Sequence, residues 1–286
     1  QILNNMKIKH LLCFIALCLF FTPGKAQQLS VMTLRNGATV YIWEDKSKPD
    51  VFGMIAFKVG SVDDPEQYTG LAHYLEHVMF KGTQTIDALD WEKEKPIYEK
   101  IIAKYDERAA LSDPAAREAV DKEINDLTRE AAQYAAGNEF SLLVDHMGGQ
   151  GLNASTGYDQ TEYHNSFPPS QLEKWLEIYS ERLIDPVFRG FQTELEAVYE
   201  EYNMYNDDRG SRMREFIYEQ AFGDHPYARP IIGLPEHLKN PQLSKLIDFY
   251  NTWYGPQNMS IILVGNIDAK EAIPMIRDKF ERVPRR

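Results

Sequence analysis

Two histidines and a glutamate stand close together in one short segment of the chain. His73 and His77 are four residues apart, and Glu76 directly precedes the second of them. On an α-helix, residues three and four positions apart lie one turn away on the same face. Two imidazoles so placed can chelate one tetrahedral zinc ion, and the neighbouring carboxylate can take a proton from a water molecule at that ion. The spacing His73-x-x-Glu76-His77 therefore indicates zinc-dependent hydrolysis.

The same pattern is also compatible with an ordinary solvated helix face, because so short a pattern arises by chance. The flanking residues favour burial over solvation; they are Leu71, Ala72, Leu75, Val78, Met79 and Phe80. Buried imidazoles and carboxylates cost free energy unless they are paired or bind a metal. A catalytic zinc site also needs a third protein ligand. Another histidine is a poor candidate, since His146, His164, His225 and His237 are each isolated along the chain.

Length, composition and charge set limits on the kind of protein. The chain has 286 residues, of which 43% are hydrophobic, enough for one large domain or two small ones. Its formal net charge of -12 at pH 7 argues against nucleic acid as a partner.

The first 26 residues have the pattern of a secretory signal peptide. Lys7 and Lys9 precede an apolar run over residues 11–21, and the small residues Gly24 and Ala26 follow it. The apolar run is too short to span a bilayer comfortably. We expect cleavage after Ala26 and export to the bacterial periplasm or cell envelope.

Removal of this segment would leave a chain without cysteine. Cys13 and Cys18 are the two cysteines of the sequence, and both lie within residues 1–26. The remaining part, 27–286, could therefore use neither a disulfide framework nor a cysteine nucleophile. No later run is long or apolar enough to predict a transmembrane segment.

Strands and helices are predicted to interleave without strict alternation, which favours an α+β fold with a mixed sheet. The sequence Asn36-Gly37 predicts a hairpin between the first two strands. The predicted strands cover residues 29–34, 39–43, 51–59, 151–156, 161–167 and 259–264. The predicted helices outside the segment 91–137 cover residues 70–80, 141–147, 168–183, 191–205, 211–222, 245–254 and 269–280.

The segment 91–137 is charged and has apolar residues at helical spacing. It breaks at Leu111-Ser112-Asp113-Pro114, where Ser112 or Asp113 can cap a second helix that starts near Pro114. We expect an antiparallel helical hairpin that stands out from the domain, with a solvated surface.

The zinc motif and its flanks resemble the M16 metallopeptidases, the family of pitrilysin, insulin-degrading enzyme and mitochondrial processing peptidase. The likeness begins at Gly60-Ser61 and continues through 70–83, Gly-Leu-Ala-His-x-x-Glu-His-x-x-Phe-Lys-Gly-Thr. The resemblance implies the LuxS/MPP-like metallohydrolase fold, a largely antiparallel sheet with helices packed on it. It also implies that His73 and His77 bind Zn2+ and that Glu76 is the general base.

The family carries its third zinc ligand on a distal helix with the pattern Glu-x-x-Ala-Val-x-x-Glu. Residues 194–201 read Glu-Leu-Glu-Ala-Val-Tyr-Glu-Glu. Alignment on Ala197-Val198 makes Glu201 the implied metal ligand and Glu194 the implied auxiliary acid. Glu200 adjoins Glu201 and leaves the register open by one residue.

Two further stretches extend the resemblance over residues 29–280. Residues 148–156 resemble the family's edge strand that pairs with extended substrate, which implies substrate contacts from Asn153 and Ala154. Residues 225–266 resemble the second half of one family repeat. Against the usual family spacing, the segment 91–137 reads as an insertion between the zinc motif and the distal glutamate.

The resemblance implies a zinc-dependent endopeptidase that cleaves peptides or unfolded polypeptides. Family enzymes add an arginine and a tyrosine from a second, related domain or subunit, and residues 27–286 match only one repeat. We therefore expect a second M16-type domain or subunit as a partner.

Two other functions compete with the endopeptidase. A non-catalytic M16-like subunit that presents substrate to a partner chain remains an alternative. S-ribosylhomocysteine lyase shares the fold and a His-x-x-Glu-His helix. It is disfavoured because that cytoplasmic family uses a cysteine near its metal.

Overall fold

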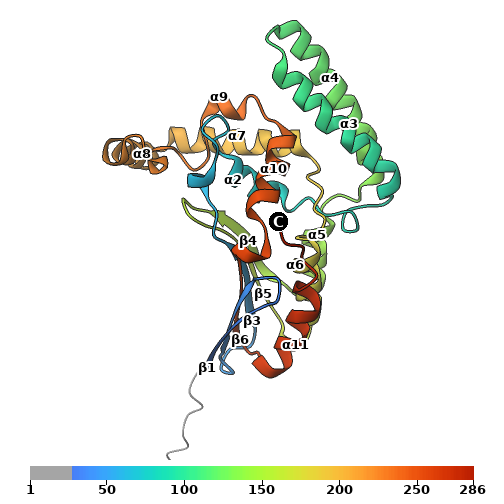
Figure 1. Cartoon of the computed structure of the whole chain (residues 1–286), viewed down its shortest axis with the longest axis vertical. Coiled ribbons are helices and arrows are strands. Elements are labelled where there is room, and N and C mark those ends of the chain that lie inside the picture. Colours follow the sequence, from blue (N-terminus) through green and yellow to red (C-terminus); the bar gives the residue numbers. More distant parts are fainter. Residues whose placement is uncertain (1–27) are drawn as a thin grey trace, which may run out of the picture.

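The computed structural model describes residues 28–286 (Figure 1). The predicted signal peptide, with both cysteines, lies outside the described residues. Among the described residues, the strands are β1 (Gln28–Thr33), β2 (Thr39–Glu44), β3 (Val51–Phe57), β4 (Gln150–Thr156), β5 (Thr161–Phe167) and β6 (Met259–Gly265). They form a single six-stranded sheet in the order β1-β2-β6-β3-β5-β4. The pair β2–β6 is parallel and the other four pairs are antiparallel. The prediction of a mixed, largely antiparallel sheet is confirmed.

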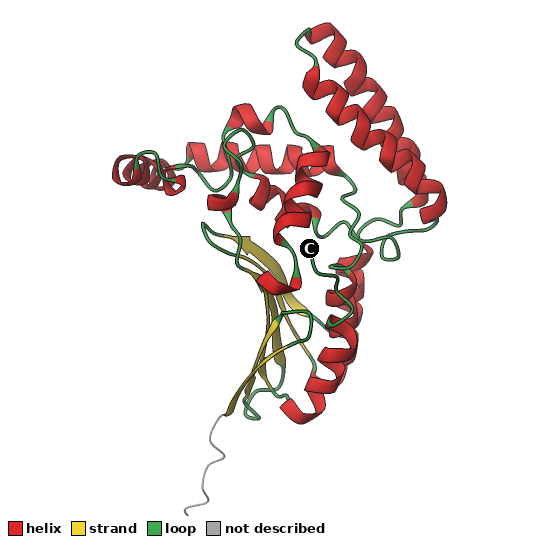
Figure 2. Cartoon of the chain, viewed as in Figure 1, coloured by secondary structure: helices red, strands yellow, loops and turns green. Residues whose placement is uncertain are grey.

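Helices cover one face of this sheet and gather at one of its ends (Figure 2). The helices are α2 (Leu71–Val78), α3 (Trp91–Ala110), α4 (Pro114–Ala131), α5 (Glu139–His146), α6 (Leu172–Glu181), α7 (Phe191–Asp207), α8 (Arg209–Phe222), α9 (Pro235–Leu238), α10 (Leu243–Trp253) and α11 (Ala269–Phe280). Helices α6 and α11 flank the sheet, while α2, α7 and α10 lie near the end of β4 (Figure 1). The predicted boundaries agree to within a few residues, apart from the short α9, which was not predicted.

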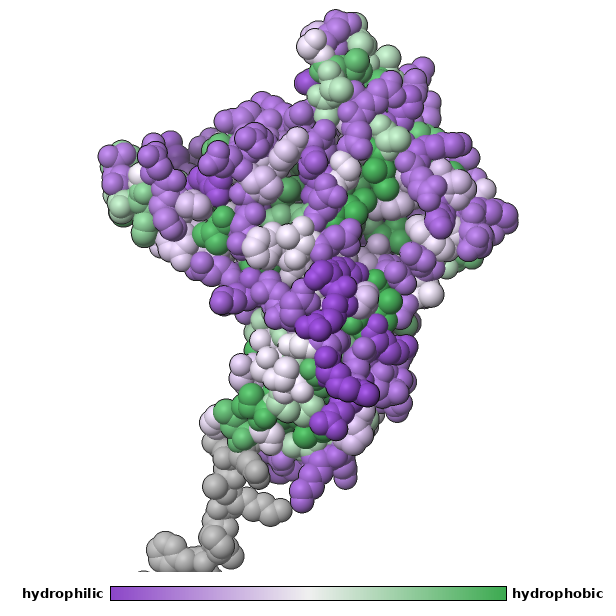
Figure 3. Space-filling view, viewed as in Figure 1, coloured by the Kyte–Doolittle hydropathy of each residue, from purple (hydrophilic) through white to green (hydrophobic). Residues whose placement is uncertain are grey.

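The alternation of side chains along the strands explains which face of the sheet is buried. On β2, Val40 and Ile42 are buried, whereas Tyr41 and Trp43 point to the opposite face and are 37% and 39% exposed. Leu29 and Val31 pair with Trp43 and Tyr41, and they share this exposed face. Figure 3 shows apolar side chains gathered in this region, near the start of the described chain. One face of the sheet therefore carries the core, and the β1–β2 end of the other face stays apolar and open.

The segment after the zinc motif forms the predicted helical hairpin. Helix α3 begins after Asp90 and α4 begins after Asp113, and each of these carboxylates accepts a backbone N–H of its helix. The buried apolar residues of the hairpin are Ile97, Ile101, Tyr105, Val120 and Ile124, and Tyr105 also packs on Phe191 of α7 with ring centres 4.8 Å apart. Figure 1 shows the two helices projecting from the rest of the molecule. Because its apolar residues are buried between the two helices and against α7, the hairpin can project without exposing a large apolar face.

None of the helices within residues 28–286 has the length and apolar character needed to cross a membrane.

The close packing of α6 on the sheet depends on a glycine in β3. A Cβ atom at Gly53 would lie 2.5 Å from Trp175 Cζ2 and 2.8 Å from Phe167 Cε1, both in buried side chains. We predict that Gly53→Ala lowers the free energy of unfolding by about 2 kcal/mol, because the indole ring must shift in a filled core. Denaturant unfolding would measure this loss.

Gly157→Ala is the matched control. A Cβ atom at Gly157 would meet Gln160 at 3.7 Å, an ordinary contact distance. We expect this variant to unfold within about 0.5 kcal/mol of the wild type. Equal stability of the two alanine variants would contradict the packing argument.

Candidate metal centre

The helix that carries the sequence motif is held at its first turn by a buried acid. Gly70 precedes α2 with a φ of 90°, a conformation that favours glycine. The Asp64 carboxylate accepts the backbone N–H groups of Gly70 and Ala72 at 2.7 and 2.8 Å. A carboxylate at this end also interacts favourably with the helix dipole. This contact fixes the start of α2, at Leu71, two residues before His73.

The other end of α2 is held by a buried arginine. Arg182 is 1% exposed, and its Nη2 donates to the Met79 carbonyl at 3.1 Å. Its guanidinium carbon lies 4.3 Å from the ring centre of Phe140 and 4.5 Å from that of Tyr163. Burial lowers the pKa of Arg182, and the surrounding tyrosines oppose this effect. Aromatic faces and a helix C-terminus both favour a cation, so they replace the missing carboxylate partner.

Helix α7 lies against α2 and brings two acids to it. Leu195 and Val198 are buried, and the Tyr74 hydroxyl of α2 donates to the Phe191 carbonyl at the start of α7. Glu194 and Glu201 lie two turns apart on this helix, so both face α2. The neighbouring Glu200 is exposed. The structure thus places Glu201, not Glu200, beside the histidines.

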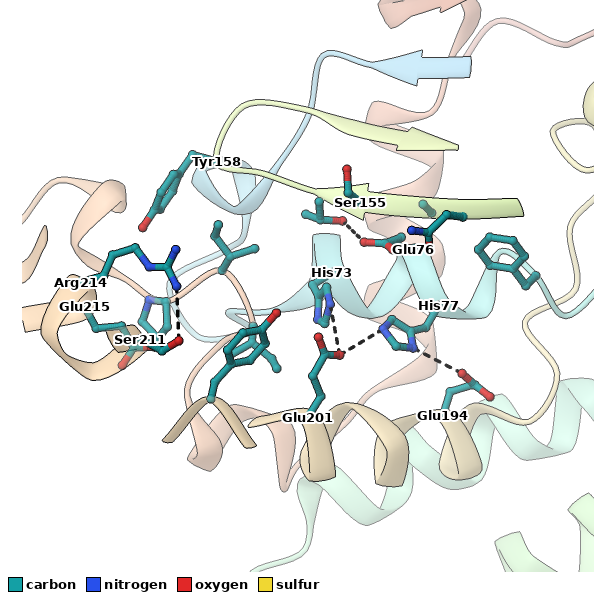
Figure 4. A pocket seen from close by; sticks show the side chains of 18 of the residues that line it. His73, Glu76, His77, Ser155, Tyr158, Glu194, Glu201, Ser211, Arg214 and Glu215 are labelled. Atoms are coloured by element: carbon teal, nitrogen blue, oxygen red, sulfur yellow. Dashed lines mark hydrogen bonds and ion pairs between the residues drawn. The ribbon is translucent and has the colours of Figure 1, made fainter. Parts of the chain in front are cut away.

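Three side chains meet in an arrangement that could hold a metal ion (Figure 4). Glu201 Oε2 lies 3.6 Å from His73 Nε2 and 3.5 Å from His77 Nε2. One ligand atom from each residue lies within 4.8 Å of the others. Ligand atoms around a tetrahedral zinc ion are about 3.4 Å apart, given bonds of about 2.0–2.1 Å. Two imidazole nitrogens, one carboxylate oxygen and these separations fit zinc.

Glu194 contacts the same site from behind His77. Its Oε2 lies 3.5 Å from His77 Nδ1, and its Oε1 forms an ion pair with Lys81. A carboxylate at Nδ1 orients the ring and leaves Nε2 free to bind a metal. Glu194 is therefore placed to orient the His77 ring, and it contacts one of the three potential ligands without being one itself.

Glu76 lies on the opposite side of the histidines, toward β4 (Figure 4). Its side chain is largely buried, and its Oε2 accepts a hydrogen bond of 2.7 Å from the Thr156 hydroxyl. Burial raises the pKa of Glu76, while the Thr156 hydroxyl and His77 oppose the shift. A carboxylate with a raised pKa is suited to take up a proton and give it back.

The two imidazoles of the metal-free site differ in protonation. Burial, together with the neighbouring His77, lowers the pKa of His73 to about 4. Burial also lowers the pKa of His77, but hydrogen bonds to Glu194 and Glu201 outweigh it and raise the pKa to about 9. At neutral pH, His73 is therefore neutral and His77 carries a proton that a metal would have to displace.

A cavity of about 730 Å³ opens above these residues. Residues 153–156 of the edge strand β4 form part of its wall, so the predicted substrate residues Asn153 and Ala154 both face it. Residues of α8 form another part, which the sequence analysis did not assign to the site; they are Ser211, Arg214, Glu215 and Tyr218. Their spacing of three, four and seven places them on one helix face, and this spacing is visible in the sequence.

Comparison with known protein families places this chain among peptidases. A family model described as "Insulinase (Peptidase family M16)" matches residues 39–95 and 126–234. A second model, "Peptidase M16 inactive domain", matches residues 242–286. The unmatched residues 96–125 belong to the α3–α4 hairpin.

Curated relatives carry zinc protease names. "Probable zinc protease PqqL" of Escherichia coli is 25% identical over 270 residues, which cover 90% of this chain and 23% of that protein. "Zinc protease PqqE" of Helicobacter pylori is 24% identical over 254 residues, covering 87% of this chain and 46% of that protein. The chain therefore spans less than half the length of these relatives.

Solved structures share the fold. The crystal structure of a protease from Helicobacter pylori matches with a TM-score of 0.70 and 22% identity, covering 91% of this chain and 51% of that one. The first half of the periplasmic protease PqqL from Escherichia coli matches with a TM-score of 0.67 and 25% identity. That match covers 90% of this chain and 47% of the solved chain.

The protonated His77 predicts that zinc affinity depends on pH. Because zinc must displace one proton from a group whose pKa is about 9, we expect the dissociation constant for zinc to fall as pH rises. The expected change is about tenfold per pH unit between about pH 6.5 and pH 8.5. Competition with a chromophoric chelator would measure it.

Glu194→Gln is the informative comparison, because it removes a carboxylate that raises the pKa of His77. We expect its pH dependence to flatten in the upper half of this range. A wild-type zinc affinity that does not change with pH would contradict the assigned protonation of His77.

Proposed function

Because the chain belongs to peptidase family M16, the insulinase family, we propose that it carries the metal centre and general base of a zinc-dependent endopeptidase. The observation that supports this most strongly is the meeting of His73, His77 and Glu201, with Glu76 beside them. These residues come from two helices far apart in the sequence, and each offers the donor type that zinc requires.

In this proposal, His73, His77 and Glu201 hold the zinc ion. Zinc bound there would polarise the scissile carbonyl and make a water molecule more acidic. Glu76 takes a proton from the attacking water and delivers it to the leaving amine. Two features favour this role: the hydrogen bond from Thr156 fixes the carboxylate, and the low exposure of Glu76 raises its pKa. Glu194 orients His77 through its Nδ1 nitrogen.

The substrate in this proposal is an extended peptide or unfolded polypeptide. Strand β4 lies at the end of the sheet and pairs only with β5 among the described strands. Its free edge, at Asn153 and Ala154, borders the cavity that contains the metal centre. A peptide can pair with such an edge through main-chain hydrogen bonds, with limited dependence on sequence.

A second M16-type domain or subunit completes the enzyme in this proposal. The chain matches 47% of the solved first half of PqqL, and the whole of that protein is about four times as long as the aligned region. The relative named as a periplasmic protease also supports export of this chain, in agreement with the signal peptide predicted at residues 1–26. A partner that closes over the cavity would exclude water and complete the contacts to substrate.

We predict that Glu76→Gln abolishes peptide hydrolysis and retains zinc. The amide cannot accept the proton, so kcat/KM should fall by at least about a hundredfold. Cleavage of a quenched fluorescent peptide and metal content by mass spectrometry would measure the two effects. The assay uses the chain alone and mixed with candidate M16-type partner chains.

Glu201→Gln and Glu200→Gln form a matched pair on adjacent positions of α7. The first should weaken zinc binding, whereas the second changes an exposed side chain and should leave both zinc and activity unchanged. If wild-type protein binds zinc but cleaves no peptide with any partner, the chain is a non-catalytic subunit. Normal turnover by Glu76→Gln would refute the assigned base.

A further inference from the structure

Helix α8 forms the wall of the cavity beyond the metal centre. It starts after Asp208, whose carboxylate accepts the Ser211 N–H at 2.7 Å. Ser211, Arg214 and Tyr218 follow one another along the face that lines the cavity. In Figure 4, Arg214 and Ser211 lie at the end of the cavity opposite to Glu194, with Tyr158 above them.

Aromatic contacts fix α8 relative to the edge strand. Tyr218 stacks on Tyr158 with ring centres 5.4 Å apart, and Tyr227 packs on the same ring at 4.7 Å. Tyr158 follows β4 by two residues. Arg214 is therefore held near the point where a peptide paired with β4 would leave the metal centre.

Arg214 differs from the other basic residues around the cavity because no acidic side chain pairs with it within the described residues. The acidic residues that line it are Glu76, Glu194, Glu201 and Glu215, and the basic ones, apart from the two histidines of the metal centre, are Lys81 and Arg214. Lys81 forms an ion pair with Glu194. Arg214 forms no ion pair within the described residues 28–286; its Nη2 donates to the Ser211 hydroxyl at 3.3 Å. Of the two basic residues, Arg214 is the one whose charge is free to meet a ligand.

Resting on the peptidase function proposed above, we propose that Arg214 binds a carboxylate of the substrate. The guanidinium presents a planar set of donors that matches a carboxylate with two parallel hydrogen bonds. The carboxylate can be an acidic side chain or the free C-terminus of a peptide. In either case, Arg214 selects for a negative charge at one fixed position along the substrate, despite four acidic residues around the cavity.

The test uses quenched fluorescent peptides of one neutral sequence. In one set, a single glutamate moves through the positions on both sides of the cleaved bond, with glutamine at each position as its reference and an amidated C-terminus. A second set has no glutamate and ends in either a free carboxylate or an amide. Wild type, Arg214→Ala and Arg214→Glu are compared, in the full chain with any partner needed for turnover.

We expect wild-type protein to prefer glutamate over glutamine at one position by about fivefold in kcat/KM, as for a partly exposed charge pair. Arg214→Ala should abolish this preference, and Arg214→Glu should reverse it, so that glutamine is preferred over glutamate at the same position. The preference should weaken at high salt. A preference confined to the free-carboxylate peptides would assign the C-terminus as the group bound.

Arg212→Glu is the matched control, because Arg212 is exposed on the same helix and does not line the cavity. It makes the same change in net charge and should retain the wild-type preference. A loss of preference in Arg212→Glu equal to that in Arg214→Glu would overturn the inference, since the effect would then come from overall charge.

Peptide binding separates this inference from the proposed function. Fluorescence anisotropy of the same peptides, labelled and added to metal-free protein, reports contact with Arg214 without any cleavage. Arg214-dependent binding without turnover would support the inference and refute the peptidase proposal. Cleavage and binding that do not depend on Arg214, or no binding of any peptide, would overturn the inference.

Discussion

The structure depends on keeping three polar side chains of one short helix in a largely buried place. His73 and Glu76 on α2 are removed from most of the solvent, and such groups lower the stability of a fold unless they are paired. Asp64 fixes the first turn of the helix and Arg182 binds its last carbonyl group. These two contacts, at opposite ends, hold the helix in one position, so its side chains can form a site of fixed geometry.

The remaining parts of the centre are arranged around this helix. Helix α7 supplies carboxylates on one side, and the edge strand β4 supplies the Thr156 hydroxyl on the other. The three potential metal ligands and Glu76, the proposed base, therefore have different surroundings. Glu201 shares its charge with two imidazoles, whereas Glu76 stays in a less polar place with a raised pKa. This difference in surroundings supports the separate roles proposed for these two carboxylates.

The α3–α4 hairpin lies between the two halves of the centre in sequence but outside it in space. Its apolar residues are buried between the two helices and against α7, and Arg108, close to the turn between α3 and α4, donates to Asn240. Because its two helices pack on each other, it can occupy the chain between His77 and Glu201 without moving α7 away from α2. The family model leaves residues 96–125 unmatched, as expected for a segment that the sheet and the metal centre do not require.

Local sequence determined much of this protein. The period of its apolar residues predicted the strands and long helices, and the four-residue spacing of His73 and His77 fixed their common face. Local sequence could not establish Glu201 as a potential metal ligand on geometric grounds, because Glu201 lies 124 positions after His77. A family resemblance suggested this residue. Only the tertiary structure brought Glu201 rather than Glu200 to the imidazoles, since the burial of Leu195 and Val198 sets the rotation of α7. The tertiary structure also placed Arg214 at the wall of the cavity. Helical spacing puts Arg214 on one face of α8 with Ser211 and Tyr218, but only the packing of α8 decides that this face lines the cavity.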